Sequence, residues 1–192
     1  MPRVRPTQDF LLFVSSVMGR GTLSEELPYS TDALPFPHRW GVSDVVTTIS
    51  SGPWDEVQIR DFLRSTIIPL RLASNGSSGP LVQSLWFWPD GTELWCCTQD
   101  SSVLARRLSR DDRVGFEVAA DTPPYRGVRG TGVAELLKDD VESALRHLIT
   151  RYQGHEKTQL SEWLLSRIES EVAIRITPRT LSSWDYSPRM KQ

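Results

Sequence analysis

The side chains that most often carry out chemistry in proteins are few in this sequence and are scattered along it. Three histidines lie far apart (His38, His147 and His155), and the acid pairs Asp111–Asp112 and Asp139–Asp140 have the positions of turn and helix-cap residues. The patterns GxxxxGK[ST], GxGxxG, HExxH and GxSxG are absent. The sequence therefore gives no support to a phosphate-binding P-loop, a dinucleotide fingerprint, a zinc protease or a serine hydrolase, and it assigns no catalytic residue.

The two cysteines, Cys96 and Cys97, are adjacent and have no other cysteine to pair with. On a strand their side chains would point to opposite faces. This excludes a disulfide framework and a metal site of the CxxC type, so no metal is expected. We expect two inert strand thiols in a reducing, cytoplasmic setting.

Composition narrows the class of protein further. The chain has 192 residues, 22 Lys and Arg, 24 Asp and Glu and a net charge of −2, which argues against nucleic acid or an anionic membrane as a partner. Its mean hydropathy of −0.33 is typical of a soluble protein. The apolar run at 10–18 is too short to span a bilayer, and no signal-type cleavage site follows it, so we expect no export.

Residues 1–50 read as an N-terminal arm and residues 51–192 as the main domain. Thr7 precedes a helical pattern up to Met18, and a proline-punctuated stretch with aromatic residues follows at 28–40. Apolar side chains at that density are expected to pack on the arm's own domain or on a partner subunit. The segment 35–40 is a candidate lid over a pocket.

The main domain shows short strands separated by turns, with a few helices. The strand order is largely sequential and has no βαβ rhythm, which predicts a small antiparallel barrel decorated by helices. Helices are expected at 55–64 with a cap at Ser51 or Asp55, from a cap at Ser101 or Ser102 to Leu108, after a cap at Asp139 or Asp140 with a buried stripe from Val141 to Ile149, and at 158–170. Strands are expected at 67–73, 81–88, 93–98, 114–119, 126–137 and 172–176, before a closing segment at 180–186.

The predicted strand 126–137 alternates in an informative way. One face carries Val128, Gly130, Gly132, Ala134 and Leu136, and the other carries Arg129, Thr131, Val133 and Glu135. Two glycines on one face leave room for a bulky neighbour. A close-packed chain segment and a planar ligand both fit this pattern.

Four segments taken in order resemble one known family. They are Leu85–Trp88, Thr98–Leu108 followed by Asp112–Val114, Thr122–Gly127 leading into Gly130–Glu135, and Ile174–Asp185. Each is weak alone, but their order and spacing are similar to those of the pyridoxamine 5′-phosphate oxidase-like, FMN-binding split-barrel family. The resemblance implies a mainly β (α+β) fold, a six-stranded antiparallel split barrel with flanking helices.

The resemblance also implies a function. It predicts a homodimeric oxidoreductase that binds FMN, or alternatively a deazaflavin, between its subunits and acts on a small-molecule substrate. By position, the cofactor-binding residues would be Gln83, Ser84, Leu85 and Trp86 along the flavin ring, Cys97, Thr98, Ser101 and Ser102 near the phosphate, and Arg126 and Gly127 at the start of the long strand.

The sequence departs from the family at the phosphate. The family's Arg-Lys pair falls on Val103 and Leu104, which removes charge-assisted hydrogen bonds worth roughly 1.5–3 kcal/mol each. Arg106, one helical turn later, is the leading replacement, with Arg71, Arg107 and Arg126 as others. Three hypotheses therefore stay open: a flavin-dependent oxidoreductase, a non-redox enzyme or ligand-binding protein on a barrel that has lost flavin binding, and an interaction module whose arm recruits a partner.

The substrate is not identified by the sequence. The oxidase's C-terminal Arg-x-His element has no match in the ending 184–190, so pyridoxamine phosphate itself is not the predicted substrate.

Overall fold

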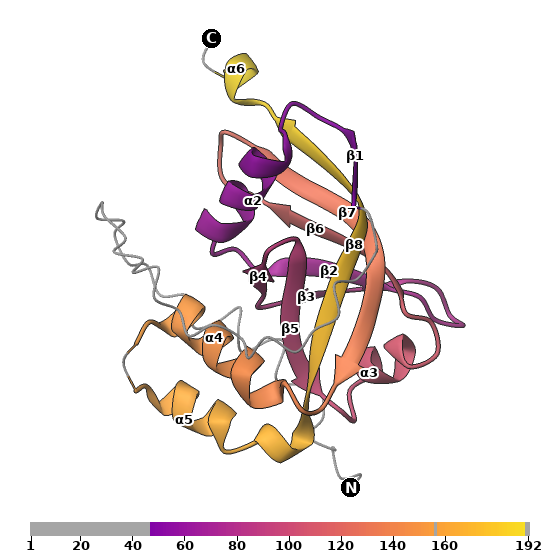
Figure 1. The fold of residues 1–192 in the computed structure, drawn as a ribbon, viewed down its shortest axis with the longest axis vertical. Coiled ribbons are helices and arrows are strands. Elements are labelled where there is room, and N and C mark those ends of the chain that lie inside the picture. The colour runs from indigo at the N-terminus through magenta and orange to yellow at the C-terminus, as the bar shows by residue number, and fades with distance from the viewer. Residues whose placement is uncertain (1–46, 156, 191–192) are drawn as a thin grey trace, which may run out of the picture. The chain divides into compact units, whose positions relative to one another are not determined.

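The computed structural model describes residues 47–155 and 157–190, which form a curled, mainly antiparallel sheet with several helices (Figure 1). The expected α+β class and barrel-like sheet are confirmed, but among the described residues the sheet has eight strands rather than the expected six. The helix and the aromatic stretch predicted before residue 47 lie outside the described residues. No helix in the described ranges is long and apolar enough to cross a membrane.

The strands follow one another across the sheet in the order β3-β2-β6-β7-β8-β5-β4. Neighbours on this path pair antiparallel, and β1 pairs parallel with β8. Because β1 begins at Thr48, the arm boundary predicted at residue 50 falls inside a strand. The strands are β1 (Thr48–Ser51), β2 (Leu70–Ser74), β3 (Leu81–Leu85), β4 (Trp88–Asp90), β5 (Glu93–Gln99), β6 (Arg113–Ala119), β7 (Arg126–Leu137) and β8 (Glu171–Asp185).

The prediction of one strand over 81–88 was wrong, and the reason is the closure of the barrel. Strand β3 pairs with β2 at one edge of the sheet, and β4 pairs with β5 at the other. Only Trp86 and Phe87 join these two edges, so the sheet must curl until its edges meet. Phe87 is fully buried at this link. Strands β4 and β5 form a hairpin, with Gly91 at positive φ in its turn.

Capping side chains begin three of the helices. Of the alternatives left open by the sequence, Asp55 forms a capping box with Gln58 at the start of α2, and Ser102 caps α3. Thr158, where a helix was expected to start, caps α5. Asp140 stands at the N-cap of α4 but makes no side-chain capping hydrogen bond. The helices are α2 (Glu56–Ser65), α3 (Val103–Leu108), α4 (Val141–Gln153), α5 (Gln159–Leu165) and α6 (Ser187–Met190), with a short 3-10 turn at Ile168–Ser170.

The glycines of β7 make room for the chain itself. A Cβ on Gly130 would lie 2.7 Å from the Phe116 ring, and one on Gly132 would lie 2.5 Å from the carbonyl oxygen of Thr177. Both positions are therefore filled by close packing against β6 and β8. Of the two explanations left open by the sequence, the close-packed neighbour is the one observed.

Two apolar clusters lie on opposite sides of β5. The larger fills the interior of the barrel and includes Cys96, whereas a smaller one sits between α4 and α5 and is flanked by Cys97. The two thiols thus point to opposite faces of their strand, as predicted. Trp95 is almost fully buried and Trp88 stacks on His147 at 4.8 Å, so all three of these side chains serve packing.

Arg151, on α4, fastens two helices together. It is only 6% exposed, and its guanidinium donates hydrogen bonds to the carbonyl oxygens of Leu63, Arg64 and Thr66. These carbonyls lie in the last turn of α2, where a helix leaves its acceptors unpaired and favours positive charge. The side chain also lies over the Phe87 ring at 4.8 Å.

Candidate functional site

The structure brings together Trp86 and Cys97, two of the predicted cofactor-binding residues. Trp88 pairs with Trp95 across β4 and β5, with Trp86 two residues before the first and Cys97 two residues after the second. Both side chains pack against the cluster between α4 and α5. The indole nitrogen of Trp86 is buried and has no hydrogen-bond partner.

Tyr152 contacts Trp86 and Phe87, the two residues that join β3 to β4. Sequence reasoning did not identify it. Its ring stacks on Trp86 with centroids 4.8 Å apart and planes 4° apart. Its hydroxyl accepts from the backbone N–H of Phe87 (3.3 Å) and donates to the carbonyl of Ile68 (3.4 Å). Burial raises the pKa of Tyr152 to about 12, so the hydroxyl keeps its proton at neutral pH. Its position four residues after Leu148, on the same face of the helix, was the sequence feature that could have indicated its burial.

Strand β3 separates the other predicted ring contacts by alternation. Gln83 pairs with Leu72 on the core side of the sheet, and its side-chain oxygen is buried without a partner. Ser84 pairs with Arg71 on the opposite, exposed face, and Leu85 belongs to the main core. Side chains of Gln83 and Ser84 therefore cannot contact the same face of one ligand from this strand.

The hydroxyl groups expected at a phosphate do lie close together. The Thr98 hydroxyl donates to Ser102 Oγ at 3.3 Å, and Ser102 Oγ in turn accepts from the backbone N–H of Ala105 at 3.0 Å. Arg106 donates to the carbonyl oxygen of Ser101. The capping interaction that starts α3 thus organises this group of residues.

The residues at the family's cation positions have different environments. Val103 is 47% exposed, whereas Leu104 is fully buried in the main core. Arg107 is already engaged, because it donates to the carbonyl oxygens of Ser74 (3.2 Å) and Gly79 (2.9 Å). On α3, this leaves Arg106 as the exposed cation nearest the hydroxyl group.

Arg126 and Gly127 lie at the far end of the sheet from these residues. Gly127 pairs with Trp184, and a Cβ on it would lie 2.5 Å from the Trp184 ring. Thr98 instead pairs with Val172, next to the level of Leu137 at the other end of β7. About 30 Å of strand separates the two levels. Within a single chain, the predicted residues therefore lie in two separate groups.

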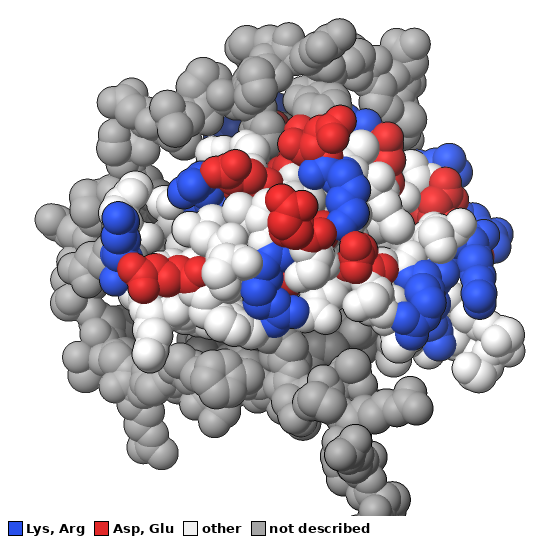
Figure 2. All heavy atoms as spheres, turned by 90° about the horizontal axis from the view of Figure 1, so that it is seen from below, with Lys and Arg blue, Asp and Glu red and all other residues white. Residues whose placement is uncertain are grey.

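Neither cysteine near the predicted site is an activated nucleophile. Burial raises the pKa of the Cys96 and Cys97 thiols, so both stay protonated. Across the ranges the structure describes, no three His, Cys, Asp or Glu side chains are grouped to hold a metal ion. On the face shown in Figure 2, acidic and basic side chains alternate among the described residues rather than forming a patch of one sign.

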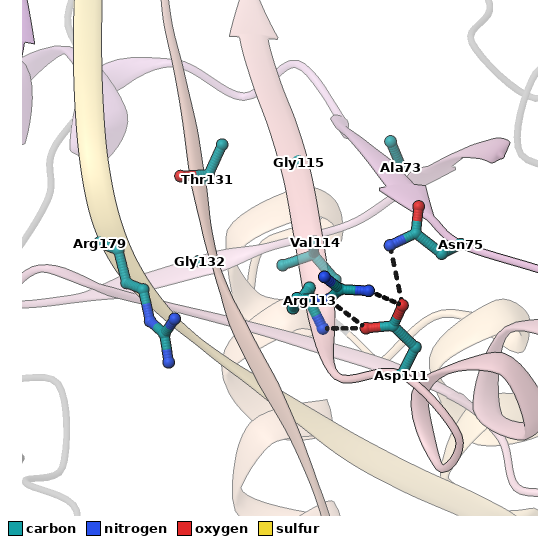
Figure 3. Close-up of a pocket in the computed structure, with 9 residues that line it drawn as sticks. All are labelled: Ala73, Asn75, Asp111, Arg113, Val114, Gly115, Thr131, Gly132 and Arg179. Carbon is teal, nitrogen blue, oxygen red and sulfur yellow. Dashed lines mark hydrogen bonds and ion pairs between the residues drawn. The ribbon is translucent and has the colours of Figure 1, made fainter.

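The outer face of the sheet carries two adjoining hollows that sequence reasoning missed. They have volumes of about 600 and 490 Å³ and share Ala73, Gly115 and Thr131. Figure 3 shows the larger one, with Arg113 and Arg179 on either side of β7. Small side chains opposite one another on neighbouring strands were the available signal.

No protein-family model matches the sequence, and no curated protein matches it. Solved structures do match. A conserved hypothetical protein from Mycobacterium tuberculosis is 28% identical with a TM-score of 0.62, covering 72% of this chain and 89% of that one. A candidate pyridoxamine 5′-phosphate oxidase from Listeria innocua is 18% identical (TM-score 0.53, 67% and 96% covered), and an F420 reductase is 22% identical (TM-score 0.54, 64% and 94% covered).

These likenesses establish the fold and leave the ligand open. Further similar structures include a FAD-binding protein and a heme storage protein. Proteins with this fold therefore bind different cofactors, so the fold by itself does not select one.

Proposed function

Because the chain has the split-barrel fold of pyridoxamine 5′-phosphate oxidase-like proteins, we propose that it is a flavin-dependent oxidoreductase acting on a small organic substrate. The cofactor would be FMN or a deazaflavin. One observation carries the proposal: the buried indole N–H of Trp86 has no partner, at the segment where the family likeness places the ring. An unpartnered buried donor costs about 1–3 kcal/mol, and a carbonyl oxygen on the polar edge of a flavin would accept from it.

The residues near the expected phosphate position also suit FMN, with one arginine in place of the family's Arg-Lys pair. The hydroxyls of Thr98, Ser101 and Ser102 would bind phosphate oxygens, and Arg106 would supply the positive charge. Its present partner is an exposed backbone carbonyl, so the side chain can turn toward an anion at little cost. Charge-assisted bonds of this kind are the strongest that a phosphate receives from protein.

A second copy of the chain would complete the site. Trp86 and Thr98 belong to one group of predicted residues, and Arg126 and Gly127 to another that is separated from it along β7. A homodimer in which one protomer supplies the first group and its partner the second would let both groups contact one cofactor. This separation supports a homodimer with its cofactor between subunits.

The chain's own part in such a reaction is positioning. A bound flavin supplies hydride-transfer chemistry. Tyr152 fixes the plane of Trp86 by stacking and ties its backbone link to the barrel. The apolar cluster between α4 and α5 excludes water from one side of this region.

The test is a visible absorbance spectrum of the purified full chain, with mass spectrometry of whatever denaturation releases. Reconstitution with FMN and with a deazaflavin follows. We expect one of the two to bind, and Trp86→Phe to weaken binding because it removes an indole donor. Trp88→Phe is the matched control, since Trp88 stacks on His147 and should leave binding unchanged. A chain that is colourless and remains empty with both cofactors would refute the proposal.

A second candidate is a split barrel that binds a ligand other than flavin. The observation that favours it is the phosphate corner, where Val103 replaces a cation and Leu104 is part of the core. Val103→Arg distinguishes the candidates, whereas Leu104→Lys would bury a charge and unfold the chain. A gain of flavin affinity in Val103→Arg indicates an eroded flavin site. If Val103→Arg gains no flavin affinity and the unaltered chain also binds no flavin, the second candidate, a ligand other than flavin, is favoured.

A further inference from the structure

An extra residue in β8 directs an arginine out of the sheet. Thr131 of β7 pairs with Thr180 and the next residue, Gly132, pairs with Pro178, so Arg179 has no partner across the ladder. This is a β-bulge, a feature that often re-aims a side chain near a functional site. Arg179 and Thr180 both lie on the outer side, between the buried Pro178 and Leu181.

The arginine reaches a hollow of about 600 Å³ on the outer face of β2, β6 and β7, which we name the outer hollow (Figure 3). Ala73, Gly115 and Gly132 line it with little or no side chain. A Cβ added at Gly115 would touch only the Ala73 side chain at 3.8 Å and the carbonyl oxygen of Gly130 at 4.0 Å, so the floor is open there. The volume is within the range of sites for small organic molecules.

Charges around the outer hollow are unequal. Arg113 donates to both carboxylate oxygens of Asp111, each at 2.8 Å, and Asn75 donates to the same carboxylate at 3.1 Å. Asp111 is thereby committed to Arg113. Arg179, in contrast, has no hydrogen-bond or ion-pair partner among the described residues. In Figure 3 no dashed line joins it to another residue that lines the hollow. Two arginines facing one carboxylate leave one positive charge available.

We propose that the outer hollow binds the carboxylate of a small organic acid, with the Arg179 guanidinium as its bidentate partner. A guanidinium presents parallel N–H donors that match the two oxygens of a carboxylate. One uncompensated positive charge matches one negative charge. The apolar floor of Ala73 and Gly115 would contact the organic part of the ligand.

The outer hollow is separate from the Trp86–Cys97 part of the proposed flavin site. Those two residues pack against the cluster between α4 and α5, and no residue that lines the outer hollow belongs to that cluster. Ser84, another predicted flavin contact, lies on the same outer face beside Arg71 of β2. The proposal concerns a different ligand from the flavin, and binding of benzoate at Arg179 is measured without any flavin.

The experiment is a titration of the ¹⁵N-labelled full chain with benzoate, followed by amide chemical shifts. We expect saturable shifts at Gly115 and Gly132, and none with the uncharged analogue benzamide. Arg179→Ala should raise the dissociation constant by about tenfold or more, because it removes a charge-assisted pair. Arg179→Lys, which keeps the charge without the fork, should fall between. Arg189→Ala, an exposed arginine on α6, is the matched control and should bind as the unaltered chain does.

Three results would overturn the proposal. Equal benzoate affinity in Arg179→Ala and Arg189→Ala would remove Arg179 from the site. Shifts confined to residues away from the outer hollow, or no shifts at all, would remove the hollow. A parallel titration with dimethyl phosphate checks the ligand class, since shifts with it and none with benzoate would reject a carboxylate. Unchanged thermal unfolding of the variants ensures that each comparison concerns binding.

Discussion

Replacing Arg151 is expected to be one of the most destabilising single changes in the described part of the chain. The variant Arg151→Met keeps the length and apolar stem of the side chain but removes all of its donors. Three carbonyl oxygens at the end of α2, those of Leu63, Arg64 and Thr66, would then lose their partner. Because Arg151 is 6% exposed, water cannot easily replace it.

The size of the effect follows from these contacts. A buried hydrogen-bonding group left without its partner costs about 1–3 kcal/mol, and the Phe87 ring also loses its stacked cation. Methionine recovers part of the packing, since it fills irregular space well. We therefore expect Arg151→Met to lower the free energy of unfolding by about 3–5 kcal/mol, the range seen when one partner of a buried charged interaction is removed. Arg151→Lys should lose less, because it keeps the charge but not the planar fork.

Urea unfolding followed by tryptophan fluorescence measures this change as a shift of the midpoint at constant slope. The control is Arg146→Ala on the same helix, which removes an exposed pair with Glu142 and should cost about 0.3–0.5 kcal/mol. If Arg151→Met and Arg146→Ala prove equally stable, Arg151 does not fasten α4 to α2 and the reasoning is refuted.

Two further predictions concern strand glycines and a buried acid. Gly132→Ala should destabilise the fold by several kcal/mol, because its Cβ would lie 2.5 Å from the carbonyl oxygen of Thr177. Gly115→Ala on the neighbouring strand is the control and should be neutral or slightly stabilising. Similar melting temperatures for the two variants would contradict this prediction. Burial raises the pKa of Glu171, which is 7% exposed, above its usual value of 4.5, against the opposing effect of Arg167. Stability contributed by the protonated acid is therefore complete below pH 4.5 and lost as the pH rises through the raised pKa. Glu171→Gln should consequently stabilise the chain at pH 7 and not at pH 4. A gain in stability that is independent of pH would contradict this reasoning.

Local features of the sequence predicted local features of the structure. Asp55, Ser102 and Thr158 begin helices because a capping side chain needs only the backbone of the next few residues. Strand β7 has the predicted bounds because its alternation is written in consecutive residues. The same reasoning failed over 81–88, where one apolar run serves two strands. No pattern within that run shows that its two halves pair with different partners.

In the candidate site, too, some residues were identified from the sequence and others only from the packing of distant segments. The sequence order carried the family likeness and therefore the identities of Trp86, Thr98 and Ser102. It did not indicate that Leu104 is a core residue, because burial depends on what packs over α3. The clustering of Trp86 with Tyr152 likewise required the barrel to close.

The sequence by itself determined most of the helical and strand segments, the starts of α2, α3 and α5 and the two-sided alternation of β7, since each depends on spacing over a few residues. Only the tertiary structure decided which strand edges meet, where Arg151 finds its carbonyls and which way the bulge at Arg179 faces. These depend on partners brought together from distant parts of the chain. Their positions follow from the lowest free energy of the whole packed domain rather than from any segment within it.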